Sequence, residues 1–70
     1  MKTEMECLGE AIRQRREELQ MTTMELASEV GILEEEISKI ETGDTDVTIH
    51  DLLKLCHALH VPFSFFIKGK

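Results

Sequence analysis

The chain has 70 residues, 41% of them hydrophobic, which is enough for one small core but leaves the stability marginal unless the domain dimerises. Only one proline and four glycines are present, and the apolar residues recur at helical spacing, which excludes a many-stranded sheet and predicts an all-α domain. The formal net charge of −6 argues against a nucleic-acid ligand, unless a local basic cluster outweighs the total.

The first helix is predicted over residues 7–19. Leu8, Ile12 and Leu19 share one face of it, and charged residues occupy the outer faces, as in a surface helix that covers a core. Residues 1–7 carry no strong helical signal and are expected to fray. Met21, which follows the helix, is expected to turn back into the core.

Two short amphipathic helices are predicted within residues 22–43, TTMELASEVGILEEEISKIETG. The first opens at Thr23, because Thr22 and Glu25 have the spacing of a capping box. It ends at Gly31, since glycine tolerates the left-handed conformation of a helix C-terminus. The apolar face of the second carries Leu33, Ile37 and Ile40, and the segment Thr42-Gly43-Asp44 stops this helix. Two such helices and a tight turn have the size of a helix-turn-helix unit.

The clearest amphipathic helix is predicted over residues 48–59. Thr48 precedes Asp51 by three residues, which is a helix start signal. The apolar stripe of this helix is expected to contain Ile49, Leu52, Leu53, Cys56 and Leu59. Pro62 suits the first position of a fifth, short helix that runs to about residue 67. We therefore expect one domain over residues 1–70, with its core at about 7–67.

These elements carry four motif pieces, LGEAIRQRREELQM, TTMELASEVGI, EEISKIETG and TIHDLLKLCHALHVPFSFF. Together they resemble the DNA-binding domain of lambda-type phage repressors and Cro, the XRE-like family, over about residues 8–67. The resemblance implies a five-helix lambda-repressor-like bundle containing a helix-turn-helix. It also implies a bidentate ion pair between Arg16, late in the first helix, and Glu41, at the end of the third; the alternative is two unrelated surface charges.

The resemblance further implies which positions face DNA. Backbone phosphates would be contacted by Thr22, Thr23, Lys39, Thr42 and Gly43, and bases would be faced by Glu34, Glu35 and Ser38. Glutamate can accept a hydrogen bond from cytosine N4 but repels nearby phosphate. Six acidic residues oppose a single base, Lys39, between residues 22 and 42, so this face is not an ordinary phosphate-binding surface.

A structural explanation for the acidic residues 34–36 is also open. Leu33 stands where the family tends to place a capping serine, and carboxylates in a first turn stabilise a helix by about 0.3–1 kcal/mol each. They would compensate for the missing cap without restoring any affinity for phosphate. The cations available for phosphate contacts are Arg13, Arg15, Lys39 and Lys54.

The aromatic residues all lie in the segment PFSFFI. By the family alignment Phe63 and Phe66 fill the core, while Phe65 falls where an exposed polar residue is usual. Phe65 beside Ile67 indicates a self-association surface, and a symmetric homodimer would relieve the small core. The alternative is a loose aromatic side chain at a frayed C-terminus.

Other classes of site find little support. Cys7 and Cys56 are expected to be reduced core thiols. Cys56, His57 and His60 form C-H-x-x-H, but they do not point the same way and a structural zinc needs four ligands, so no metal site is expected. No catalytic residue set and no cofactor motif is found. The absence of a signal peptide and of an apolar 18-residue stretch predicts a cytoplasmic protein with no membrane partner.

Two functions remain in competition. The first is an XRE-family transcriptional regulator that binds double-stranded DNA as a homodimer through an unusually acidic recognition helix. Its operator should be rich in cytosine at the contacted positions, and its binding should weaken steeply with salt. The second is a degenerate helix-turn-helix domain that no longer binds DNA and acts as a protein–protein interaction module, through the acidic helix or the Phe65 surface.

Overall fold

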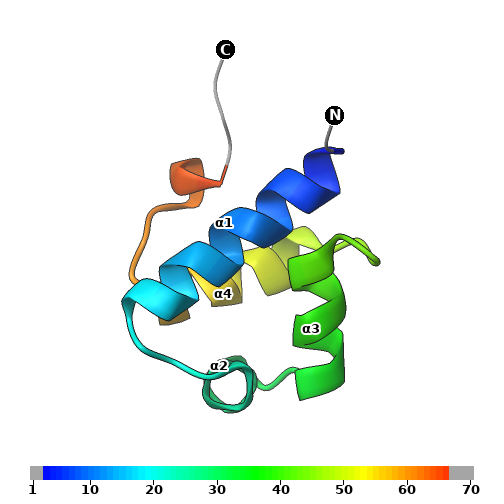
Figure 1. Ribbon diagram of the computed structural model, residues 1–70. Coiled ribbons are helices and arrows are strands. Elements are labelled where there is room, and N and C mark those ends of the chain that lie inside the picture. The colour runs from blue at the N-terminus through cyan, green and yellow to red at the C-terminus, as the bar shows by residue number, and fades with distance from the viewer. Residues whose placement is uncertain (1–2, 67–70) are drawn as a thin grey trace.

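The computed structural model describes residues 3–66. Within that range it contains four α-helices and one short 3-10 helix (Figure 1), which are α1 (Glu4–Glu18), α2 (Thr23–Val30), α3 (Glu34–Thr42), α4 (Ile49–Leu59) and η1 (Phe63–Phe65). No strand is present among these residues, and the predicted all-α class is confirmed.

The predicted fifth helix is wrong. Only a single 3-10 turn follows α4, because Pro62 is extended and the next hydrogen bonds are of the i to i+3 kind. Phe65 N–H donates to Pro62 O at 2.9 Å, and Phe66 N–H donates to Phe63 O at 3.1 Å. Ile67, which the prediction included, lies outside the described residues.

The first helix begins at Glu4, three residues earlier than predicted, because Thr3 caps it. The Thr3 hydroxyl accepts from Glu6 N–H at 3.1 Å, and the Glu6 carboxylate accepts from Thr3 N–H at 2.9 Å. This is the same Thr-x-x-Glu spacing that marks the start of α2. The expectation that this segment frays is therefore wrong from residue 3 onward.

Local signals place the ends of the two central helices as predicted. Thr22 and Glu25 form a reciprocal capping box at the start of α2, and Gly31 ends that helix with a left-handed φ of 73°. At the start of α3, Leu33 makes no side-chain cap, and the three glutamates of the first turn lie where carboxylates interact favourably with the helix dipole. Leu33 is 76% exposed, so the prediction that it lies on the apolar face of this helix is wrong. Gly43 ends α3 with a φ of 80°.

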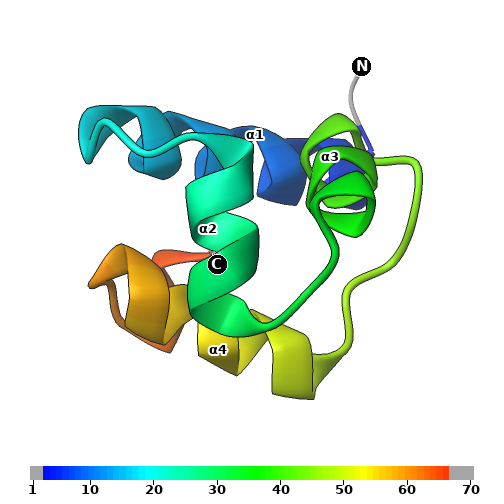
Figure 2. The ribbon, with the colours of Figure 1, turned by 90° about the horizontal axis from the view of Figure 1, so that it is seen from below.

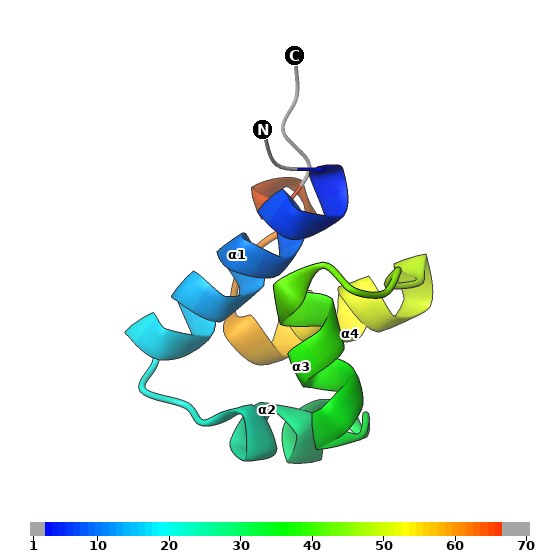
Figure 3. The same ribbon diagram turned by 45° about the vertical axis from the view of Figure 1, so that its right-hand side comes forward.

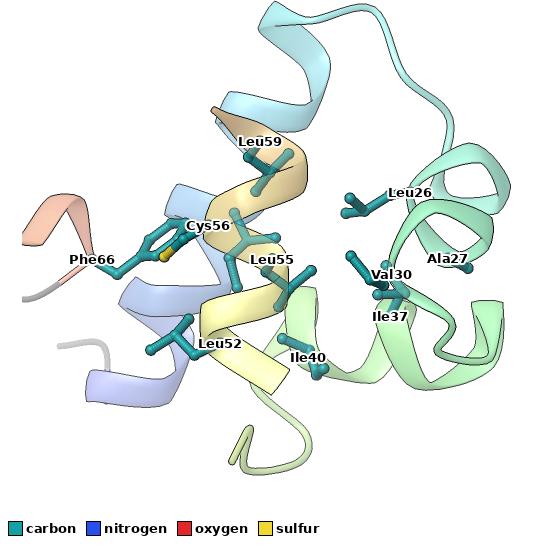
Figure 4. Packing of buried hydrophobic residues seen from close by; sticks show 11 residues of the cluster. Leu26, Ala27, Val30, Ile37, Ile40, Leu52, Leu55, Cys56, Leu59 and Phe66 are labelled. Carbon is teal, nitrogen blue, oxygen red and sulfur yellow. The ribbon is translucent and has the colours of Figure 1, made fainter. Parts of the chain in front are cut away.

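The core is formed where one face of α4 meets α1 and α2, and the inner face of α3 completes it (Figure 4). On α4 the buried residues are Leu52, Leu55, Cys56 and Leu59. The predicted stripe was wrong at Ile49 and Leu53, whose side chains are 63% and 50% exposed. The predicted stripe and the buried stripe both have helical spacing and share three residues. Periodicity alone therefore could not decide whether Leu53 or Leu55 is buried.

The two cysteines differ in environment. Cys56 is buried as predicted, and burial raises the pKa of its thiol because the thiolate is poorly solvated there. Cys7 is exposed on α1, so the expectation of a second core thiol is wrong.

The helices are arranged so that α3 lies on the outside. Figure 2 shows α2 running from the end of α1 toward α4, with α3 beside it, and Figure 3 shows α3 beside α1 and in front of α4. Ile37 and Ile40 turn inward from α3 and are at most 3% exposed. The opposite face of α3 is left to solvent.

An ion pair between Arg16 of α1 and Glu41 of α3 holds the end of α3 in place. Arg16 Nε donates to Glu41 Oε2 at 2.7 Å, and Nη2 donates to Oε1 at 3.1 Å. The remaining Nη1 donates to Met21 O at 2.7 Å, in the segment that leads into α2. Both residues are only 9% exposed, so the pair is largely shielded from water.

The fold favours the charged form of the Arg16 guanidinium. The hydrogen bond to Glu41 raises the pKa of this group, and desolvation opposes that shift only in part. Since the pKa is raised in the folded state, the stabilisation that this shift contributes is complete below the ordinary arginine pKa. That contribution is lost as the pH rises through the still higher folded-state value.

Gly9 allows the closest approach between α1 and α3. A Cβ atom at this position would lie 2.6 Å from Glu41 O and still closer to Ile40 O, both of which are backbone atoms that cannot move aside easily. Nothing local in the sequence distinguishes this glycine from any other small residue in a helix, so its role could not be predicted from the sequence.

We predict that Gly9→Ala destabilises the domain by about 3 kcal/mol, because the added methyl group forces α1 away from α3. Urea unfolding followed by circular dichroism measures the change. Gly31→Ala is the matched control, since a Cβ there meets nothing within 4 Å and only its φ of 73° is unfavourable. Its expected cost is about 1 kcal/mol. Equal losses for both variants would contradict the close approach.

Replacing the buried carboxylate should be still more costly. Glu41→Gln removes the buried counter-charge of Arg16 and leaves only the exposed Glu17 carboxylate, 3.8 Å away, so it should lower the free energy of unfolding by about 3 kcal/mol or more. Glu36→Gln, on the first turn of the same helix, should change it by no more than about 0.5 kcal/mol. A Glu41 variant as stable as the Glu36 variant would show that the pair contributes nothing.

Candidate nucleic-acid interface

The eight residues that the family resemblance assigns to DNA lie at the start of α2 and along α3 and its C-cap. Six of them are exposed: Thr22, Glu34, Glu35, Ser38, Lys39 and Thr42. Thr23 and Gly43 are half-buried. All eight therefore have some access to solvent, and their elements are joined by the turn at Gly31 and packed against each other (Figure 3).

Two of the hydroxyl groups assigned to phosphates already have acceptors within the protein. Thr23 Oγ1 donates to Glu34 Oε2 at 2.8 Å, which joins the first residue of α2 to the first residue of α3. Thr42 Oγ1 lies within 3.2 Å of the carbonyl oxygens of Ser38 and Lys39 and 3.1 Å from Asp44 Oδ2. The single hydrogen of each hydroxyl is therefore in use on this surface.

Backbone donors differ between the two helices. Gly43 N–H donates to Ile40 O at 3.2 Å and is not free for another acceptor. At the start of α2, the capping box uses the N–H groups of Thr22 and Glu25. The N–H groups of Thr23 and Met24 make no hydrogen bond within residues 3–66 and remain able to bind an acceptor.

The supply of cations is smaller than the sequence suggested. Arg15 was counted as available for phosphate, but its Nε donates to Leu59 O at 2.9 Å and its Nη1 donates to Glu18 Oε1 at 3.1 Å. It thus satisfies the last carbonyl of α4 rather than facing a ligand. Among the described residues, Lys39 is the only base on α3. No pattern within the first helix indicates that Arg15 reaches α4.

The aromatic cluster follows the expected orientation. Phe66 is buried, Phe63 packs against the core and Phe65 is 43% exposed. The rings of Phe65 and Phe66 meet edge to face, with centroids 5.1 Å apart and an interplanar angle of 81°. A cavity of about 480 Å³ beside them is lined mainly by apolar residues: Glu4, Cys7, Leu8, Ala11, Leu52, Phe65 and Phe66.

Two other possibilities were tested on the described part of the chain. No group of three or more His, Cys, Asp or Glu side chains there is placed to hold a metal ion. Likewise, none of the helices between residues 3 and 66 has the length and apolar character needed to cross a membrane.

Solved structures of similar fold are bacterial regulators. The clp gene regulator ClgR from Corynebacterium glutamicum is 28% identical, over 96% of this chain and 87% of that one, with a TM-score of 0.89. The restriction-modification controller protein C.Esp1396I is 25% identical, over 97% of this chain and 88% of that one, with a TM-score of 0.85. The controller protein C.AhdI from Aeromonas hydrophila shares the fold at 22% identity, over 89% of this chain and 94% of that one, with a TM-score of 0.86.

A search of curated proteins gives no significant match. The family model described as "Helix-turn-helix domain" matches residues 8–62, which is most of the chain and includes α2, α3 and α4 entirely. With the structural likeness to ClgR and C.Esp1396I, this match places the chain in a known family. The chain belongs to the helix-turn-helix domain family, as a member of the XRE (lambda-repressor/Cro-like) type.

Proposed function

We propose that the chain is a transcriptional regulator that binds double-stranded DNA as a homodimer, with α3 as an unusually acidic recognition helix. The observation that carries the proposal is the position of α3, which is anchored by Ile37, Ile40 and Glu41 and leaves its other face exposed. ClgR and C.Esp1396I, which share this fold, are described as a gene regulator and a controller protein.

In this proposal α3 lies in the major groove. Glu34, Glu35 and Ser38 face base edges, where the two carboxylates accept hydrogen bonds from cytosine N4. Lys39 contacts a phosphate as a cation. The start of α2 contributes the hydroxyls of Thr22 and Thr23 and the N–H groups of Thr23 and Met24, while Thr42 and Gly43 approach the backbone from the end of α3.

The electrostatic part of such binding is small. Hydroxyl and N–H groups release no counterions, so Lys39 is the one residue among the eight proposed contact positions that contributes to the salt dependence. A dimer would therefore show a slope of about −2 in a plot of log affinity against log salt concentration. This is a shallower dependence than the sequence led us to expect, and the engagement of Arg15 with Leu59 and Glu18 is part of the reason.

The charge pattern also supports a second candidate function, a protein-interaction module that no longer binds DNA. All three residues of the first turn of α3 are acidic, and the Thr23 hydroxyl is held by one of them. A surface of this kind repels phosphate and suits a basic protein partner. The two functions differ in whether duplex DNA is bound at all.

Fluorescence anisotropy with a labelled random-sequence duplex at low salt separates them. We predict micromolar binding by the wild type, and roughly tenfold tighter binding by the Glu34→Gln/Glu35→Gln double variant, because two repulsive charges are removed from each protomer. A Glu4→Gln/Glu29→Gln variant, which changes the net charge equally outside the eight positions, should gain much less. If neither the wild type nor the Glu34/Glu35 variant binds, the interaction module is favoured.

The homodimer is proposed to form through the surface around Phe65. Phe65 is an exposed aromatic side chain beside the apolar cavity of about 480 Å³, so a second copy could bury both. Ile67, the other residue assigned to this interface, lies outside the described residues. The dimer would place one α3 at each half-site of an operator.

We predict that Phe65→Ser converts the dimer into a monomer at micromolar concentration, as measured by sedimentation equilibrium. Leu53→Ser is the matched control, since Leu53 is 50% exposed on α4 and does not line that cavity. It should leave the dimer intact. If Leu53→Ser dissociates the dimer and Phe65→Ser does not, the interface lies on α4 instead.

A further inference from the structure

One hydrogen bond crosses the proposed DNA-facing surface between the starts of α2 and α3. The Thr23 hydroxyl donates to Glu34 Oε2 at 2.8 Å, although the two residues are 11 positions apart in the sequence. Thr23 is half-buried, whereas Glu34 is exposed. The carboxylate therefore reaches from α3 to the N-terminus of α2, which is where the proposed function places a DNA phosphate.

Glu34 and a phosphate compete for the same hydrogen. A threonine hydroxyl has one hydrogen to donate, and carboxylate and phosphate oxygens are both acceptors. Thr23 therefore cannot donate to Glu34 and to DNA at once. The carboxylate also brings negative charge to a helix N-terminus that would otherwise favour an anion. The contact thus removes a phosphate donor and adds repulsion at one point.

We propose that Glu34 gates the phosphate contact of Thr23 according to the base that it meets, an inference that rests on the DNA-binding function proposed above. A cytosine amino group in the major groove donates to a glutamate carboxylate and draws it away from Thr23. The released hydroxyl then donates to a phosphate, so the base contact and the backbone contact form together. At other bases, Glu34 stays on Thr23 and keeps phosphate out.

Glu35 provides a matched control for this gate. It is exposed on the same turn of α3 and carries the same charge, but no hydrogen bond joins its carboxylate to another side chain or to the backbone of the described residues. Glu34→Ala and Glu35→Ala remove the same atoms and the same charge. Only the first of these substitutions frees the Thr23 hydroxyl.

The first test uses a labelled random-sequence duplex at fixed low salt. Glu34→Ala should tighten binding roughly threefold to tenfold more than Glu35→Ala, which is the range expected for one added hydrogen bond. In a Thr23→Val background that difference should disappear. Two results would overturn the gate while leaving DNA binding itself established. One is an equal gain in affinity for Glu34→Ala and Glu35→Ala when Thr23 is present. The other is a difference between these two variants that persists in the Thr23→Val background.

The second test uses duplexes selected by the wild type from a random library. Thr23→Val should weaken binding to the selected duplexes roughly threefold to tenfold and leave binding to the random duplex unchanged, because Thr23 is released only at the right base. Glu34→Ala should lose the preference for cytosine. A purely structural role of Thr23 would weaken both kinds of binding alike, which would overturn the gate.

Circular dichroism melting of each variant confirms that the fold is intact before binding is compared.

The proposed function and the gate fail in different ways. If no variant, including Glu34→Ala/Glu35→Ala, binds any duplex, the DNA-binding function is wrong and the gate falls with it. If the variants bind but Thr23 and Glu34 act independently, only the gate is wrong.

Discussion

The guanidinium of Arg16 is buried between helices, and such a charge is stabilising only if nearly every donor has an acceptor. Here Nε and Nη2 bind the Glu41 carboxylate, and Nη1 binds Met21 O. These contacts join α1, the segment before α2 and the end of α3. With the backbone contact at Gly9, they fix which face of α3 points inward. Because these contacts hold the other face of α3 inward, the acidic face is exposed.

The inner and outer faces of α3 are therefore under separate constraints. The inner face carries Ile37, Ile40 and Glu41, which hold the helix in place, while the outer face makes no contact with the core. The first turn of α3 carries three carboxylates, and two of them, Glu34 and Glu35, are at positions that the proposed function places against DNA. Arg15 and Arg16 of α1 make contacts within the fold, and Lys39 is the only base on α3. In the proposed DNA-binding function, recognition by this surface would depend more on directed hydrogen bonds than on charge attraction.

Much of this architecture could be predicted from the sequence, because local signals decide it. The cap at Thr22, the left-handed Gly31 and the start signal at Thr48 depend on residues within one helical turn, and each is found in the structure. The cap at Thr3 has the same spacing, with Glu6 three residues later, so the true start of α1 is also marked by a local signal in the sequence.

The remaining features depend on contacts between distant segments. Leu53 and Leu55 both fit a helical stripe, and only the packing of α4 shows that Leu55 is the buried one. Arg15 reaches a carbonyl 44 residues away, and Thr23 meets Glu34 across the turn at Gly31. No single-sequence pattern links such pairs. The pairing of Arg16 with Glu41 was suggested only by the family resemblance, since the two residues are 25 positions apart.

The anchoring of α3 by the buried ion pair is tested most directly by a double-mutant cycle. Urea unfolding at neutral pH would be measured for Arg16→Met, Glu41→Leu and the variant with both substitutions. The account predicts a loss of about 3–5 kcal/mol for each single variant, and a coupling free energy of about 2 kcal/mol or more, because the double variant buries no unpaired charge. Single losses that simply add, with a coupling free energy near zero, would contradict it.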